Sequence, residues 1–128
     1  MSRFDTTGAI DCDVHPPSPR RDDLYPYLDD YWKEIVVTRE VDILELNAFP
    51  ERTLPYMRPD WKTSGDPLEA MQRNLLDPLK LDHAILNVVS GAHALFDPYL
   101  SAAICRATND WLIDKWLDRD PRLRASML

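Results

Sequence analysis

The sequence has little cysteine, which argues against a disulfide-stabilised protein and against a cysteine-based zinc site. Only two cysteines, Cys12 and Cys105, occur among the 128 residues. They stand far apart inside apolar patterns, without the short spacings of a metal knuckle or the density of a disulfide framework. We therefore expect two buried free thiols and no redox chemistry.

Positive charge and long apolar runs are scarce as well. The chain has 15 Lys and Arg against 22 Asp and Glu, which gives a net charge of −7. Its basic residues are interspersed with acidic ones, so no stripe exists to neutralise a phosphate backbone, and we expect no nucleic-acid partner. The first ten residues lack a secretory core, and no run approaches the roughly 18 apolar residues of a membrane span. We expect a cytoplasmic protein without a membrane partner.

The composition suits a single modest α/β domain, because a hydrophobic share of 45% is enough for a core. Three regions differ in pattern. Residues 1–19 hold a first strand, residues 20–63 are irregular and rich in Pro and aromatics, with one short helix expected around 24–33, and residues 64–128 read as helix, strand, helix and strand.

Two Asp-Pro pairs predict the starts of the main helices. Asp66 and Asp97 each supply a capping carboxylate immediately before a Pro at the first helical position. The first helix is expected to end near Leu76 because Pro78 follows, and the second to run to about Leu117. The runs 84–89 and 123–128 predict strands, the former covered on both faces, so the order of elements indicates a parallel sheet.

The first strand carries the chemically informative residues. From Gly8 to His15 apolar and polar residues alternate, so Asp11, Asp13 and His15 are expected on one face. Ionisable groups at i and i+2, about 7 Å apart at Cα, can turn onto one divalent cation. The alternative is an edge strand with a solvated polar face.

The motif Ile10 to Pro17, Ile-Asp-Cys-Asp-Val-His-Pro-Pro, resembles the first strand of the amidohydrolase-related family that includes aminocarboxymuconate semialdehyde decarboxylase. In that family Asp-x-His-x-His or Asp-x-Asp-x-His is followed by Pro. The resemblance continues, in the same order, through Leu81 to Asn87, Arg106 to Leu112 and Asp120 to Leu123.

The resemblance implies that Asp13 and His15 are metal ligands, with Asp13 in place of the commoner histidine, and that Asp11 holds the site without binding the ion. Carboxylate with imidazole suits zinc first and manganese second. His93 follows a strand on the side where such barrels keep their active sites, so a substrate contact is expected. His83, at the start of the second strand and so at the barrel end away from the chemistry, is expected in a surface or packing role. Arg122 and Arg124 are expected to be solvated charges near the start of a strand.

The family's fold is a (β/α)8 barrel of roughly 250 residues, and this sequence matches only its amino-terminal strand-helix units. We therefore expect a fragment of a metal-dependent hydrolase or decarboxylase for a small carbonyl or carboxylate substrate, inactive alone because no catalytic residue is matched here. Its partner would be a second copy or a complementary fragment. The alternative is a non-catalytic interaction or scaffold module derived from the same fold.

Overall fold

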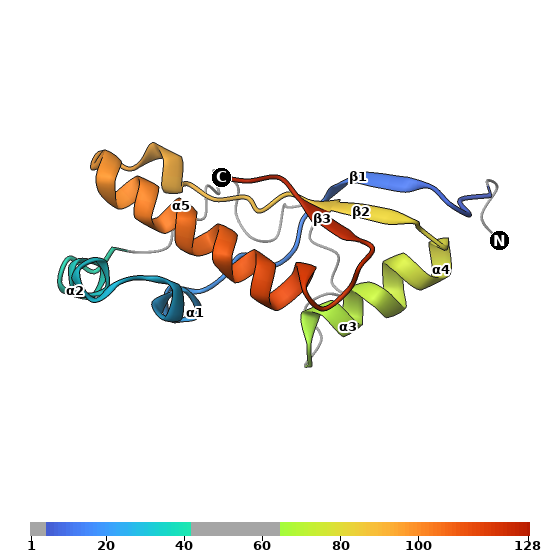
Figure 1. Cartoon of the computed structure of the whole chain (residues 1–128), viewed down its shortest axis with the longest axis horizontal. Coiled ribbons are helices and arrows are strands. Elements are labelled where there is room, and N and C mark those ends of the chain that lie inside the picture. The colour runs from blue at the N-terminus through green and yellow to red at the C-terminus, as the bar shows by residue number, and fades with distance from the viewer. Residues whose placement is uncertain (1–4, 42–64) are drawn as a thin grey trace, which may run out of the picture.

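A three-stranded parallel sheet organises the chain, which a computed structural model describes for residues 5–41 and 65–128 (Figure 1). Its strands are β1 (Ile10–Val14), β2 (His83–Leu86) and β3 (Leu123–Ala125), in the order β1-β2-β3. Both pairings are parallel. The expected α/β class and the parallel sheet are thus confirmed, although each strand is shorter than its sequence pattern predicts.

A register shift interrupts β1 and changes which residues share a face. Asp11 pairs with Ala84 and Val14 with Leu86, so three steps along β1 match two along β2. Paired residues of neighbouring strands point to the same side, which places Asp11 with Val14 rather than with Asp13. The expectation that Asp11, Asp13 and His15 share one face is therefore wrong. The extra residue in β1 interrupts the alternation of faces that the sequence pattern predicts.

The segment expected to be irregular is largely helical where it is described. It contains α1 (Arg21–Leu24), the 3-10 turn η1 (Tyr25–Tyr27) and α2 (Asp30–Thr38). The single helix expected around 24–33 was wrong: Leu28 is extended, and Asp29 caps a new helix by accepting the Trp32 N–H. The remainder of this predicted region, 42–64, lies outside the described residues.

The first Asp-Pro pair starts a helical segment that passes through a proline. The Asp66 carboxylate accepts the Leu68 N–H and begins α3 (Pro67–Met71), which continues through the π-helical turn η4 (Gln72–Leu76) into α4 (Asp77–Leu79). The expected end near Leu76 was wrong. In the wider turn the Asp77 N–H reaches back to the Gln72 carbonyl, which accommodates Pro78 without an ordinary α-helical bond there.

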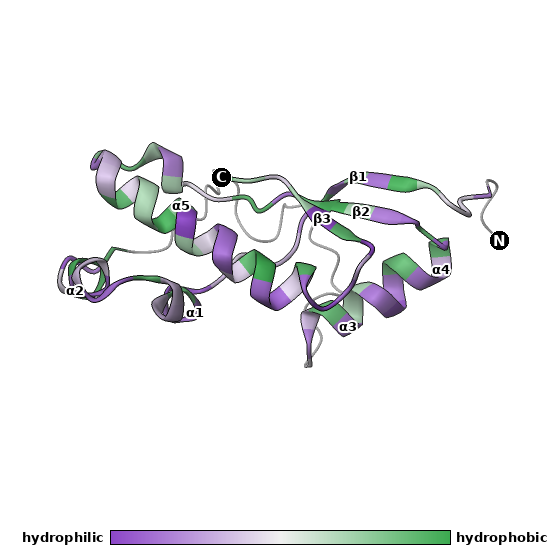
Figure 2. Ribbon diagram, viewed as in Figure 1, coloured by the Kyte–Doolittle hydropathy of each residue, from purple (hydrophilic) through white to green (hydrophobic). Residues whose placement is uncertain are grey.

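The second Asp-Pro pair behaves as predicted. The Asp97 carboxylate accepts the N–H groups of Tyr99 and Leu100 at the start of α5 (Pro98–Leu112), and the π-helical turn η6 (Ile113–Leu117) extends it to the expected end. Apolar positions recur along α5 between polar ones (Figure 2). No helix of the described residues is long and apolar enough to cross a membrane.

The helices cover one face of the sheet. Along β2 and its continuation, Ala84, Leu86 and Val88 are buried, whereas His83, Ile85 and Asn87 are half-buried. The expectation that this strand is covered on both faces is therefore not met by the described residues. Trp111 and Trp116 belong to the core.

The two cysteines lie closer to solvent than the sequence suggests. Cys12 is exposed within the register shift of the outer strand β1, and Cys105 is half-buried on α5. Ile10, on the same strand, is 55% exposed. The expected burial of both thiols was wrong, but both are free.

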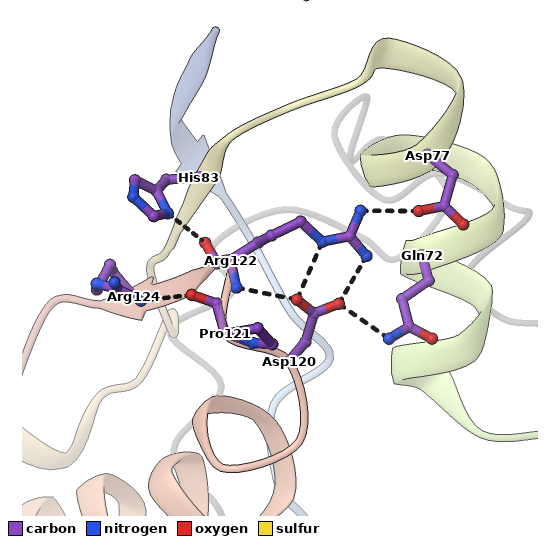
Figure 3. A network of polar contacts seen from close by, with 7 residues as sticks. All are labelled: Gln72, Asp77, His83, Asp120, Pro121, Arg122 and Arg124. Carbon is purple, nitrogen blue, oxygen red and sulfur yellow. Dashed lines mark hydrogen bonds and ion pairs between the residues drawn. The ribbon is translucent and has the colours of Figure 1, made fainter. Parts of the chain in front are cut away.

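A network of charges joins the amino end of β3 to the α3–α4 segment (Figure 3). Asp120 is buried and accepts from the Arg122 guanidinium at 2.7 and 3.0 Å and from the Gln72 amide at 2.9 Å. Arg122 also reaches Asp77 at 2.8 Å. The expectation of a solvated Arg122 was wrong. The network lies at the amino end of the sheet, so it serves stability, since parallel α/β folds place ligands at the carboxyl ends of their strands.

Candidate metal centre

Polar side chains gather at the carboxyl ends of the three strands. Asp13 lies at the end of β1 and His15 just beyond it, Asn87 directly follows β2, and Ser126 directly follows β3. In a parallel sheet these ends meet at one edge, so residues far apart in sequence come into contact. This is the edge at which barrels and open α/β sheets place ligands.

The His15 ring lies between an acceptor of β2 and the carboxylate of Asp13. Its Nδ1 is 2.9 Å from the Asn87 carbonyl oxygen, and its Nε2 is 3.2 Å from Asp13 Oδ1. A carbonyl can only accept, so Nδ1 is the donor in the contact with Asn87. Two acceptors at this separation are bridged by a proton or by a cation.

Asp13 is held by two neighbours although its side chain is 79% exposed. The Asn87 Nδ2 group donates to its Oδ1 at 3.3 Å. The Asp11 carboxylate accepts the Asp13 backbone N–H at 3.1 Å. Asp11 thus holds the backbone that carries Asp13.

Sequence reasoning missed Asn87 and Ser126. The Ser126 hydroxyl donates to Asn87 Oδ1 at 2.7 Å, and Asn87 Nδ2 also donates to the Cys12 carbonyl at 3.1 Å. A signal was present, because an amide directly after a buried parallel strand stands at the chemical end of that strand. Ser126 falls inside a run that reads only as a strand.

The other two histidines lie apart from this cluster in the sheet. His83 starts β2, and its Nδ1 is 3.3 Å from the Arg122 carbonyl, at the opposite end, as predicted. His93 is exposed in the 3-10 turn η5 (Ala92–Ala94), on the loop that follows β2. Within residues 5–41 and 65–128 no group of three His, Cys, Asp or Glu side chains could hold a metal ion, so His93 does not complete a set with Asp13 and His15.

A comparison with protein families finds that residues 10–128 match the amidohydrolase family. The chain belongs to the amidohydrolase family. None of the curated proteins compared matches it. An amidohydrolase domain implies a metal-dependent, hydrolase-type protein, and members of this family commonly bind divalent metals.

Asp13 and His15 suit a pair of amidohydrolase metal ligands. Around a tetrahedral ion with bonds near 2.05 Å, neighbouring donor atoms lie about 3.3 Å apart, and Nε2 and Oδ1 of this pair are 3.2 Å apart. The proton on Nδ1 is donated to a carbonyl, which is how metal-binding histidines are usually oriented. Zinc takes four ligands, and a pair of residues accounts for two of them.

Proposed function

We propose that this amidohydrolase domain serves a metal-dependent hydrolase or decarboxylase in which Asp13 and His15 hold one divalent cation. The contact between His15 Nε2 and Asp13 Oδ1 supports the proposal most directly, because it brings a lone pair and a carboxylate to the separation that one ion requires. An imidazole and a carboxylate suit zinc, with manganese as the second candidate.

When bound, the cation supplies Lewis acidity toward a water or a substrate oxygen. The residues of the chain have simpler tasks. Asn87 keeps the His15 ring in one tautomer through its carbonyl, and Asp11 fixes the backbone of Asp13. The negative charge of Asp13 counters the charge of the ion, and its exposure leaves the outer side of the pair open to a small molecule.

We further propose a small carbonyl or carboxylate compound as substrate, in keeping with a resemblance to the decarboxylase branch of these proteins. His93 is the proposed substrate contact, because it is exposed on the loop after β2, on the carboxyl side of the sheet. The domain division into 1–19, 20–63 and 64–128, as strand-helix units of a (β/α)8 barrel, is part of the same proposal. So is assembly with a second copy or a complementary chain, which would supply the missing ligands.

Metal analysis of matched variants tests the proposal. Asp13→Ala and His15→Ala in the full chain are each expected to lose bound zinc or manganese, measured by elemental analysis after dialysis and by calorimetric titration. Asp110→Ala and His93→Ala are the controls, since both side chains are exposed and lie outside the pair.

Two outcomes separate the roles. Unchanged metal content in both D13A and H15A would overturn the metal assignment and favour an interaction module of the same fold. For His93→Ala we expect full metal content and, with a turned-over substrate, a raised KM at an unchanged kcat. Loss of metal in H93A would contradict the substrate role.

A further inference from the structure

Asn87 contacts both proposed metal ligands, and it does so through two different groups. Its main-chain carbonyl oxygen lies 2.9 Å from His15 Nδ1, and its side-chain Nδ2 lies 3.3 Å from Asp13 Oδ1. The same Nδ2 group reaches the Cys12 carbonyl at 3.1 Å. The residue directly after β2 therefore contacts both the imidazole ring of His15 and the carboxylate of Asp13.

The orientation of the Asn87 amide is itself supported from β3. The Cys12 carbonyl and the Asp13 carboxylate can only accept, so the NH2 group of the amide faces them and its oxygen faces Ser126. The Ser126 hydroxyl lies 2.7 Å from that oxygen and 3.3 Å from the Leu86 carbonyl, and its one proton serves the shorter contact. The reverse orientation would oppose the amide oxygen to a carboxylate. The hydroxyl thus supports the orientation in which the amide donates to Asp13.

The backbone around Ser126 is tied down in turn. The Ser126 N–H donates to the Leu86 carbonyl at 3.0 Å, continuing the β2–β3 pairing. Two residues further on, Leu128 makes two hydrogen bonds with Asn109 on α5. The Asn109 Nδ2 donates to the Leu128 carbonyl at 3.2 Å, and the Asn109 Oδ1 accepts from the Leu128 N–H at 3.0 Å. Hydrogen bonds thus hold Ser126 against the end of β2 and hold Leu128 against α5.

We infer that Asn87 is the positioning residue of the metal pair and that Ser126 locks its amide in the orientation that serves Asp13. The inference rests on the proposed function, in which Asp13 and His15 hold the ion. Neither residue is a ligand: Asn87 acts on Asp13 and His15, and Ser126 acts on Asn87.

The test measures zinc and manganese affinity of the full chain by calorimetric titration, with competition by a chelator. Asn87→Ala is expected to weaken affinity by about 10- to 100-fold, the usual effect of removing a group that orients a ligand. Ser126→Ala is expected to weaken it about 2- to 10-fold, the loss of one neutral hydrogen bond. Asn74→Ala, which removes a half-buried amide from η4, is the matched control and should leave the affinity unchanged.

A second readout works without metal. In the metal-free protein the 15N chemical shifts of the His15 ring report which nitrogen carries the proton. The N87A variant keeps the main-chain carbonyl, so we expect the Nδ1-protonated form to persist in it while its metal affinity falls. That combination assigns the effect to the side-chain contact with Asp13 and shows that the variant is folded.

The outcomes keep the two proposals apart. Affinity lost in D13A and H15A but unchanged in N87A and S126A would overturn the positioning role and leave the metal pair intact. Affinity unchanged in all four variants would overturn the proposed function. If the His15 ring signals of N87A show a mixture of protonation forms, the Ser126→Ala variant provides the test, because this substitution leaves the backbone pairing between Ser126 and Leu86 in place. An unchanged metal affinity in S126A would then contradict the role proposed for Ser126.

Discussion

Asp120 is the one buried charged side chain among the described residues, at 3% exposure. A carboxylate in that position has to be matched by donors, and here it receives both a two-pronged contact from Arg122 and the amide of Gln72. These hydrogen bonds, with Arg122 first among them, lower the pKa of Asp120 from 3.8 to about 2. The ionised form therefore stabilises the folded chain.

This lowered pKa predicts a dependence of stability on pH. Because the folded value lies below the ordinary one, the contribution of Asp120 is complete above about pH 4 and is lost as the pH falls through 2. Its size is about 2 kcal/mol. Asp120→Asn should therefore be about 2 kcal/mol less stable than the wild type at pH 6, and the difference should shrink as the pH falls, as measured by urea unfolding at several pH values.

The comparison with Asp118→Asn provides the control. Asp118 is an exposed carboxylate two residues earlier, so its replacement should leave stability nearly unchanged at every pH. The other carboxylates titrate alike in each protein and cancel in the difference. A wild-type and D120N difference that stays constant from pH 6 to pH 2.5 would rule out the proposed role of the ionised form.

At the scale of single residues, the sequence predicts a residue's place better than its partners. Asp13, His15 and His93 could be placed on the carboxyl side of the sheet from their positions after or along strands. The partnership of Asp120 with Gln72 joins elements 48 residues apart, and nothing in either local pattern indicates it. The ion pairs of Arg122 with Asp120 and Asp77 were missed for the same reason.

The helices begin with side-chain caps that differ in what surrounds them. The Asp97 carboxylate accepts hydrogen bonds from two backbone N–H groups and makes no other polar contact among the described residues. The Asp66 carboxylate accepts a hydrogen bond from the Leu68 N–H and also forms an ion pair with Arg119. The Arg119 contact is the largest cause that lowers the pKa of Asp66. The two caps therefore separate the cost of a missing cap from the cost of a missing ion pair.

We expect Asp97→Ala to cost about 1 kcal/mol, and Asp66→Ala up to about 2 kcal/mol because an ion pair is lost as well. The free energy of unfolding from denaturant titration measures both. Asp97→Asn keeps an oxygen that accepts the same N–H groups, so it should restore most of the loss. Equal stability of D97A and wild type would show that the cap is not needed.

At the scale of elements, local chemistry predicts helix starts well and strand faces poorly. An Asp-Pro pair is a strictly local signal, and both predicted starts are confirmed. Whether Pro78 ends a helix depends instead on the π turn before it, in which the Asp77 N–H bonds to Gln72. Likewise the faces of β1 depend on a register shift against β2, and no pattern within β1 alone reports it.

The whole sheet leaves apolar side chains at its margins. Strands β1 and β3 are the outer strands of the described sheet, and Ile10 on β1 is 55% exposed. Beyond the strands, Phe96, Tyr99 and Met127 are exposed too. Exposed strand edges with apolar residues recruit other chains.

We therefore expect the chain to self-associate in a concentration-dependent manner, measured by size-exclusion chromatography with light scattering. Ile10→Lys should reduce the association, because a charge on an outer strand disfavours edge-to-edge pairing. Val37→Lys makes the same change on the exposed side of α2, where Val37 is 52% exposed, and should have no effect. A monomer at all concentrations, or equal effects of I10K and V37K, would contradict a role for the sheet edge.

At the scale of the molecule, the order of elements was enough to predict a parallel α/β sheet, and the family match over residues 10–128 agrees with it. The sequence could not predict how polar groups from three strand ends converge. That convergence depends on which residue comes directly after β2 and which comes directly after β3. The predicted end of a strand is uncertain by more than one residue, so the sequence could not identify these residues.

The hydrogen bonds that link Ser126 to Asn87, and Asn87 to His15, determine when the site can form during synthesis of the chain. His15 leaves the ribosome roughly 110 residues before Ser126, an interval of several seconds at about 5 to 20 residues per second. For much of that interval the motif that carries the proposed ligands lacks its partner strand β2, since its contacts with Asn87 span more than 70 residues. Folding of such long-range parallel pairings is slow. The ligand pair is thus among the first parts of the domain to be made and the last to be set in order, so an ion that arrives early meets an unformed site.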